Sequence, residues 1–117
     1  MEEKLTVLSK FFAIDIIQIC KEIRENRNER VIVNQLLRSG TSIGANIHEG
    51  NYASSRLDFI NKFQIALKEC YETTYWLEIF QETGYIYEDE YKALRDKCDK
   101  IRKKLTSSIT TAKANME

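Results

Sequence analysis

The chain has 117 residues, the length of one domain, and its 43% hydrophobic and 31% charged residues are typical of a folded domain and argue against global disorder. Its 18 basic and 18 acidic residues give a formal net charge of zero, which excludes the strong overall attraction to phosphate backbones found in basic nucleic-acid-binding proteins. With no proline and only four glycines, the composition favours long uninterrupted helices. We therefore expect a single all-α domain over residues 1–117.

The first two predicted helices span about residues 3–25 and 29–49. Apolar residues recur at helical spacing along one side of the first helix, at Leu5, Leu8, Phe12, Ile16, Ile19 and Ile23. In the second helix the core positions step by three and four residues, at Val33, Leu36, Gly40, Ile43 and Ile47. We expect Asn26 to adopt the left-handed conformation, Asn28 to cap the second helix and Gly50 to end it.

The last two predicted helices span about residues 56–83 and 88–112. Ser55 and Asp58 resemble a capping box at the start of the third helix, and Gly84 is placed to end it. The core seam of the third helix runs through Phe59, Phe63, Ala66, Cys70, Thr73, Leu77 and Phe80. The fourth helix repeats this spacing at Tyr91, Leu94, Cys98, Ile101, Leu105, Ser108 and Ala112. Four helices of similar length with short connections predict an up-down-up-down four-helix bundle.

The third helix carries more apolar surface than one seam needs. Further apolar and aromatic residues broaden its stripe beyond the usual width of about 100°, at Ile60, Leu67, Tyr71, Tyr75, Trp76 and Ile79. A wide core helix in a small bundle is one explanation, and an interface between subunits is the other. Aromatic enrichment favours the interface. The interface residues that we expect are Tyr71, Tyr75, Trp76 and Ile79.

Residue types suited to catalysis or metal binding are sparse. His48 is the only histidine, which excludes a catalytic triad, a histidine pair or a two-histidine zinc site within one chain. Glu69 and Glu72 have no histidine three residues later, as a di-iron site would need, and we expect Glu69 on the surface. The three cysteines lack metal-ligand spacing and fall on apolar stripes as buried thiols: Cys20, Cys70 and Cys98. We expect no catalytic residues, metal or cofactor.

The second helix combines small residues with a polar line. Gly40 and Gly44, four residues apart, form a groove that admits the backbone of a neighbouring helix. Beside the apolar face runs a polar line of Gln35, Ser39, Ser42, Asn46 and Glu49. A solvated face is one explanation, but short Ser and Asn side chains usually occur in helices where close packing or hydrogen bonding needs them. The competing hypothesis is a polar network, between helices or between subunits, that joins Arg38, Asn46, Glu49 and Glu72.

Basic residues gather in two places. One group lies on the fourth helix, at Lys97, Lys100, Arg102, Lys103 and Lys104, and the other lies at the first turn, at Arg24, Arg27 and Arg30. A solvated helix face with cations near its C-terminus is the ordinary explanation. If several copies of the fourth helix line a ring, their fields add to form a phosphate-binding surface, and binding would then be sequence-tolerant.

The segments QLLRSGTSIGANIHEG (35–50) and FINKFQIALKECYETTYWLEIF (59–80) together resemble the bacterial family of intervening-sequence, or S23-type, proteins. Members of that family were first noticed as open reading frames within insertions of large-subunit ribosomal RNA genes. The shared pattern falls on Arg38, Ser42-Ile43, Asn46-Ile47, Glu49-Gly50 and Glu72. His48 departs from the pattern, which usually has Ala there.

The resemblance implies a four-helix bundle that assembles as a ring-like homopentamer. A similar protein, the accessory variability protein of diversity-generating retroelements, shares this fold and is implicated in binding nucleic acid and a reverse transcriptase through a basic surface. From residues and resemblance together we expect a non-enzymatic, homo-oligomeric protein with weak, sequence-tolerant binding of RNA or DNA. The alternative is an adaptor whose ring surface docks another protein without nucleic acid.

The segment MEEKLTVLSKFF lacks the basic region and cleavage site of a signal peptide, and the apolar runs are too short to span a bilayer. We therefore expect a cytoplasmic protein without membrane contact.

Overall fold

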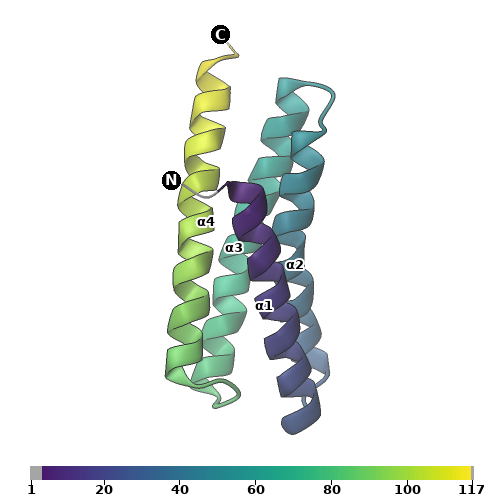
Figure 1. The fold of residues 1–117 in the computed structure, drawn as a ribbon, viewed down its shortest axis with the longest axis vertical. Coiled ribbons are helices and arrows are strands. Elements are labelled where there is room, and N and C mark those ends of the chain that lie inside the picture. Colours follow the sequence, from purple (N-terminus) through teal and green to yellow (C-terminus); the bar gives the residue numbers. More distant parts are fainter. Residues whose placement is uncertain (1–3, 117) are drawn as a thin grey trace.

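The computed structural model describes residues 4–116, which form four helices: α1 (Leu5–Asn26), α2 (Val31–Asn51), α3 (Arg56–Glu82) and α4 (Glu88–Ala114). The helices run alternately down and up the long axis (Figure 1). Each packs against its neighbour in the chain, and α4 closes the bundle against α1, so α1 and α3 lie at diagonal corners. The prediction of an all-α four-helix bundle is confirmed.

The connection between α1 and α2, residues 27–30, differs from its prediction. The predicted start of the first helix at residue 3 lies outside the described residues. Asn28, at φ 55°, adopts the left-handed conformation that we expected of Asn26, which is the last residue of α1. Nor does Asn28 cap α2. The Glu29 carboxylate accepts hydrogen bonds from the backbone N–H groups of Ile32 (3.2 Å) and Val33 (2.8 Å), so its oxygens satisfy donors that the helix leaves free.

The prediction that Gly50 ends the second helix is wrong, because α2 continues to Asn51 and Gly50 is buried within it. A Cβ atom at Gly50 would lie 2.7 Å from the ring of Phe63, so glycine is required there for the close approach of α3. Gly84 does end α3, at φ 81°, as predicted, and the Ser55 hydroxyl accepts the N–H of Asp58 at 3.1 Å, which is one half of the predicted capping box. These two signals were purely local, whereas the role of Gly50 depends on the packing of a second helix.

The core lies along the centre of the bundle and draws on all four helices. Its largest fully buried apolar side chains are Phe12, Phe80, Ile16, Ile23, Leu36, Ile43, Ile47, Leu77, Ile101 and Leu105. Two predicted seams shift by one position, since Ile60 is buried while Phe59 is only half-buried, and Ile109 is buried while Ser108 is half-buried. Four further predicted core positions are half-buried and pack against the core: Leu5, Leu8, Ile19 and Tyr91. The helical period therefore located the inward side of each helix but not the depth of every residue on it.

The three cysteines, Cys20, Cys70 and Cys98, are buried and free, as predicted. Burial raises the pKa of the Cys20 thiol to about 12, so this group is protonated at neutral pH. The Cys98 thiol lies 3.6 Å from the carbonyl oxygen of Cys70, across the contact between α3 and α4. All three cysteines therefore serve as small apolar residues of the core. Among residues 4–116, no helix is both long and apolar enough to cross a membrane.

Candidate interaction surfaces

Gly40 and Gly44 of α2 both face α1. A Cβ atom at Gly40 would lie 2.8 Å from the side chain of Ile16, and one at Gly44 would lie 3.3 Å from the backbone oxygen of Ser9. Ile16 is fully buried and β-branched, so its side chain has little freedom to move aside. The two glycines therefore allow α1 to lie close to the backbone of α2, and the neighbour admitted by this groove belongs to the same chain.

A cluster of charged side chains joins α2 to α3. Arg38 forms an ion pair with Glu72, and its Nη1 atom lies 3.2 Å from Oε2 of Glu69. The indole N–H of Trp76 donates to Glu72 Oε2 at 3.1 Å. We call Arg38, Glu69, Glu72 and Trp76 the Arg38 cluster. The sequence predicted the pairing of Arg38 with Glu72 but not the other two members. Glu69 is less exposed than expected, with 17% of its side-chain surface accessible.

The surroundings of Glu72 within the Arg38 cluster favour the ionised form of its carboxyl group. Partial burial acts to raise the pKa of Glu72, but the hydrogen bonds from Trp76 and Arg38 act in the opposite direction and prevail, so this pKa lies below its ordinary value. The hydrogen bond to Glu72 likewise raises the pKa of Arg38. Arg38 keeps 49% of its side-chain surface exposed, so solvent screens the pair. The Arg38 cluster therefore orients α2 against α3 more than it stabilises the fold.

Asn46 and Glu49 are not part of the Arg38 cluster, contrary to the predicted network. The Asn46 amide donates to the carbonyl of Ser42 at 2.8 Å, and the Ser42 hydroxyl donates to the carbonyl of Arg38 at 2.6 Å, so both side chains bond within α2. Glu49 instead pairs with Lys62 of α3 at 3.3 Å. Asn46 and Glu49 do not reach the Arg38 cluster because they lie two and three helical turns beyond Arg38 along α2.

A buried hydroxyl pair, which the sequence pattern did not predict, also joins α2 and α3. The hydroxyl oxygens of Ser39 and Thr73 lie 3.0 Å apart as hydrogen-bond partners. Each is also near a carbonyl of its own helix, Ser39 at 3.3 Å from Leu36 and Thr73 at 2.7 Å from Glu69. Ser39 was in the polar line and Thr73 in the core seam, so the available signal was a polar residue at a core position on each of two adjacent helices.

The outward side of α3 carries exposed apolar and aromatic side chains, which we call the α3 face: Leu57, Ile65, Tyr71 and Tyr75. Tyr71 is 57% and Tyr75 55% exposed. The other two residues expected at an interface, Trp76 and Ile79, are half-buried, and Trp76 packs against the core. The guanidinium of Arg102 lies over the ring of Tyr71, 5.9 Å from its centroid. Of the four expected interface residues, the two tyrosines are therefore the most available to a partner.

The basic residues do not form one surface. Lys103 and Lys104 share a shallow depression with Leu5, at the start of α1, whereas Arg24, Arg27 and Arg30 lie around its end. At 1.5 Å per residue the two groups are about 30 Å apart along the bundle. Several members have partners: Arg24 donates to Asn34 at 2.8 Å, Lys97 pairs with Asp15 at 2.6 Å, and Arg102 lies 3.7 Å from Asp99. Within residues 4–116, Lys100 and Lys103 are exposed and form no ion pair.

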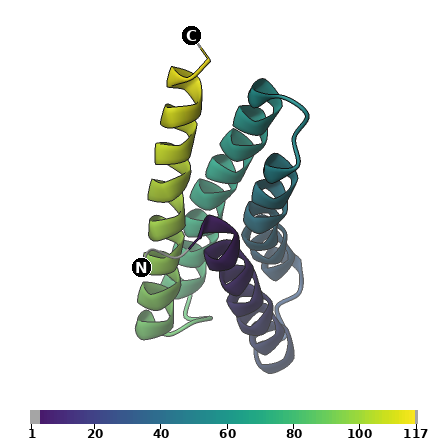
Figure 2. The ribbon, with the colours of Figure 1, turned by 45° about the horizontal axis from the view of Figure 1, so that its top comes forward.

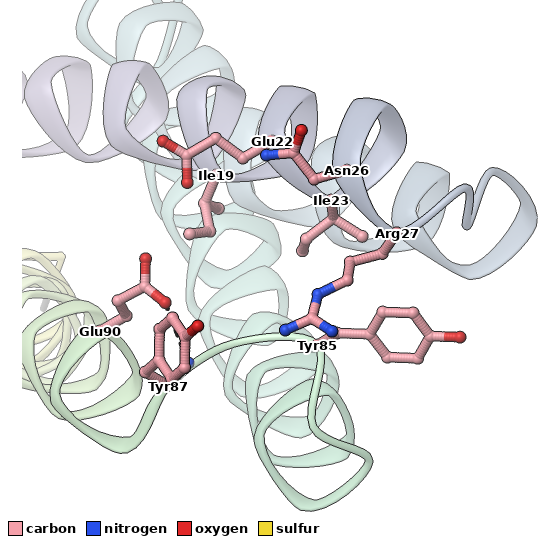
Figure 3. A pocket seen from close by; sticks show the side chains of 8 residues that line it. All are labelled: Ile19, Glu22, Ile23, Asn26, Arg27, Tyr85, Tyr87 and Glu90. Atoms are coloured by element: carbon pink, nitrogen blue, oxygen red, sulfur yellow. Dashed lines mark hydrogen bonds between the residues drawn. The ribbon is translucent and has the colours of Figure 1, made fainter.

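Arg27 lines a pocket of about 350 Å³ at the lower end of the bundle, between α1 and the loop that joins α3 to α4 (Figure 3). The other lining residues are Ile19, Glu22, Ile23, Asn26, Tyr85, Tyr87 and Glu90. The carboxylate of Glu90 is held at the start of α4 by the N–H of Tyr87, at 2.9 Å. Two carboxylates and one guanidinium make this pocket mixed in charge, so it does not extend a phosphate-binding surface.

No set of three or more His, Cys, Asp or Glu side chains within residues 4–116 is arranged to hold a metal ion. The fold and these surfaces define the class of protein: an all-α four-helix bundle with a small-residue, polar contact between α2 and its two neighbours. The profile of the 23S rRNA-intervening sequence protein matches residues 3–107, and the chain belongs to this family.

A solved structure supports this assignment. It is the crystal structure of a protein with unknown function from the S23 ribosomal protein family of Bacteroides thetaiotaomicron, with a TM-score of 0.89 and 45% sequence identity. The similarity covers 91% of this chain and 98% of that one. A comparison with curated proteins found no match. The family expected from the motif at residues 35–50 is confirmed, and the neighbouring structure carries no established activity from which function could be read.

Proposed function

We propose that this protein is a non-enzymatic, self-assembling helical bundle whose oligomer presents a binding surface. The observation that carries this proposal is the α3 face, where Tyr71 and Tyr75 lie one turn apart and each is more than half exposed. Tyrosine is enriched at protein interfaces because its ring is apolar while its hydroxyl keeps a polar partner. Assembly removes this surface from water, which is the main favourable term in association.

Light scattering of the purified protein tests assembly. The homopentamer that the family resemblance implies would have a mass of about 68 kDa, five times the 13.7 kDa chain. Tyr75→Glu places a charge on the α3 face and should reduce the mass, whereas Ala93→Glu, at an exposed position on α4, should leave it unchanged. A wild-type mass near 13.7 kDa would refute self-assembly.

Weak, sequence-tolerant binding of RNA or DNA is the more specific part of the proposal. Its supporting observation is that Lys100 and Lys103 are exposed on α4 and, within residues 4–116, without an ion-pair partner. In a ring, copies of this surface would add their fields although the single chain is neutral. The pairing of Arg24, Lys97 and Arg102 within the bundle limits the number of phosphate contacts per chain.

A salt titration tests nucleic-acid binding. Affinity for single-stranded RNA should fall with added salt, with a log–log slope of about −0.7 for each phosphate contact. Lys100→Glu with Lys103→Glu should weaken binding and flatten that slope. The comparison with the same change in charge is Lys92→Glu with Lys113→Glu, at exposed positions nearer the two ends of α4, and it should change binding less.

If RNA and DNA are not retained even at low salt, the adaptor is the remaining candidate function. In that case the ring surface would dock another protein without nucleic acid. Light scattering would still report an oligomer, so this outcome rejects nucleic-acid binding and leaves self-assembly intact.

A further inference from the structure

The outward side of α1 carries an apolar stripe that the fold leaves partly exposed. We call it the α1 stripe: Val7, Phe11, Ile14 and Ile17, which are between 39% and 59% exposed. Their spacing of four, three and three residues places them on one side of the helix, opposite the buried residues Phe12, Ile16 and Cys20. A run of four exposed apolar residues at helical spacing indicates an interaction surface.

The α1 stripe and the α3 face point away from each other. Because α1 packs on α2 and α4, and α3 packs on the same two helices, the two lie at diagonal corners of the bundle. Figures 1 and 2 both show α1 across the front of the molecule with α3 behind it. The protein therefore has two unlike apolar surfaces on opposite sides.

The two surfaces are similar in area. Taking ~200 Å² for a fully exposed large apolar side chain, the exposed fractions amount to about 400 Å² on each surface. A stable interface buries about 800 Å² on each partner, and roughly 60% of that area is apolar. Each surface alone thus supplies most of the apolar area that one side of a stable interface needs.

A groove beside the α1 stripe suits the aromatic side chains of the α3 face. It holds about 310 Å³ between α1 and α2, and half of the residues that line it are small: Ser9, Ala13, Gly44 and Ala45. The other lining residues, Thr6, Lys10, Thr41 and His48, supply polar groups. A tyrosine needs an apolar surface for its ring and a polar partner for its hydroxyl, and this groove provides both.

We propose that the α1 stripe of one copy packs against the α3 face of the next copy, so that the chains assemble head to tail. This inference rests on the self-assembly proposed above and names its two contact surfaces. A two-fold contact would use the same surface on both copies and would leave the other apolar surface in water. A head-to-tail contact covers both, and its repetition gives a closed ring or an open filament.

Mixing two variants tests the head-to-tail contact. Phe11→Glu blocks the α1 stripe and Tyr75→Glu blocks the α3 face, so each variant alone should have a mass near 13.7 kDa. Mixed together, they keep one intact contact, between α3 of the first and α1 of the second. The mixture should therefore form a complex of about 27 kDa, twice the mass of one chain. If either variant still forms a dimer alone while the mixture forms nothing new, the contact is two-fold and the proposal is wrong.

Cysteine cross-linking decides the case in which a single contact is too weak to survive dilution. Phe11→Cys and Tyr75→Cys place thiols at exposed positions, while the native cysteines are buried. A short bismaleimide should link the two variants to each other in the mixture, and neither variant to itself. Equal far-ultraviolet circular dichroism of variants and wild type shows that the fold is kept. An assembled wild type without this cross-link overturns the contact alone, whereas a monomeric wild type overturns self-assembly itself.

Discussion

Arg38 of α2 and Glu72 of α3 form an ion pair at the surface of the bundle, and both belong to the motif by which the family was expected. The indole of Trp76, one turn further along α3, donates to the same carboxylate at 3.1 Å. Because Arg38 and Trp76 both hold the Glu72 carboxylate, its orientation is fixed. A fixed carboxylate on α3 can in turn set where Arg38, and with it α2, lies along the axis of α3. The motif therefore encodes the α2–α3 contact.

Replacing Glu72 by glutamine should lower the free energy of unfolding by about 0.5–1 kcal/mol, because the pair with Arg38 is lost while the side-chain shape is kept. The expected effect is small because 35% of the Glu72 side chain and 49% of the Arg38 side chain are exposed and screened by water. Urea unfolding measures it. In a double-mutant cycle with Arg38→Met, the two changes should not be additive.

The control for this substitution is Glu82→Gln, at an exposed position of the same helix, which should leave the urea midpoint unchanged. Additive effects of Glu72→Gln and Arg38→Met would show that the ion pair contributes nothing measurable in solution.

Acid should remove the contribution of Glu72. Its folded-state pKa is lowered from the ordinary value of 4.5, so the folded state binds the proton less readily than the unfolded chain does. The resulting stabilisation is fully present above pH 4.5 and is lost as the pH falls through the lower, folded-state pKa. The difference in urea midpoint between wild type and Glu72→Gln should therefore shrink between pH 6 and the acid limit. A constant difference across that range would contradict the lowered pKa.

Gly50→Ala should destabilise the fold by about 1–3 kcal/mol, the usual effect of overpacking a core. The new Cβ atom would lie 2.7 Å from the ring of Phe63 and 3.3 Å from Cβ of Lys62, so α3 or the ring must move. Alanine's helix propensity, worth about 1 kcal/mol over glycine, opposes this effect. Thermal unfolding gives the sign. A higher midpoint for Gly50→Ala would mean that the Phe63 ring moves aside without strain.

The sequence predicted the parts of the structure that depend on one helix at a time. Periodicity located the inward sides of the helices because each helix must bury one side. Gly84 acted through its own backbone conformation, and Ser55 acted through a side-chain hydrogen bond to a residue three positions later. Gly50 was misassigned because a glycine near a helix end serves equally for a left-handed turn and for a close contact, and only the position of Phe63 distinguishes the two. Likewise, periodicity leaves the axial shift between α2 and α3 undetermined.

That axial shift explains what was missed at the α2–α3 contact. It brings Glu69 and Trp76 to Arg38 and sends Glu49 to Lys62. The α1 stripe is a different case, because its signal was present in the sequence. Val7, Phe11, Ile14 and Ile17 repeat at helical spacing on the side opposite the core. A search for a second apolar side on each predicted helix would have found it.

Alkylation of the cysteines should report the opening of the core. Burial raises the pKa of Cys20 to about 12, so at pH 8 roughly one thiol in ten thousand is the reactive thiolate, and the closed core also blocks the reagent. Iodoacetamide should leave the native protein unmodified for hours and label all three cysteines once urea unfolds it, as followed by intact mass. Rapid labelling of Cys20 alone would instead mean that α1 separates from the bundle without global unfolding.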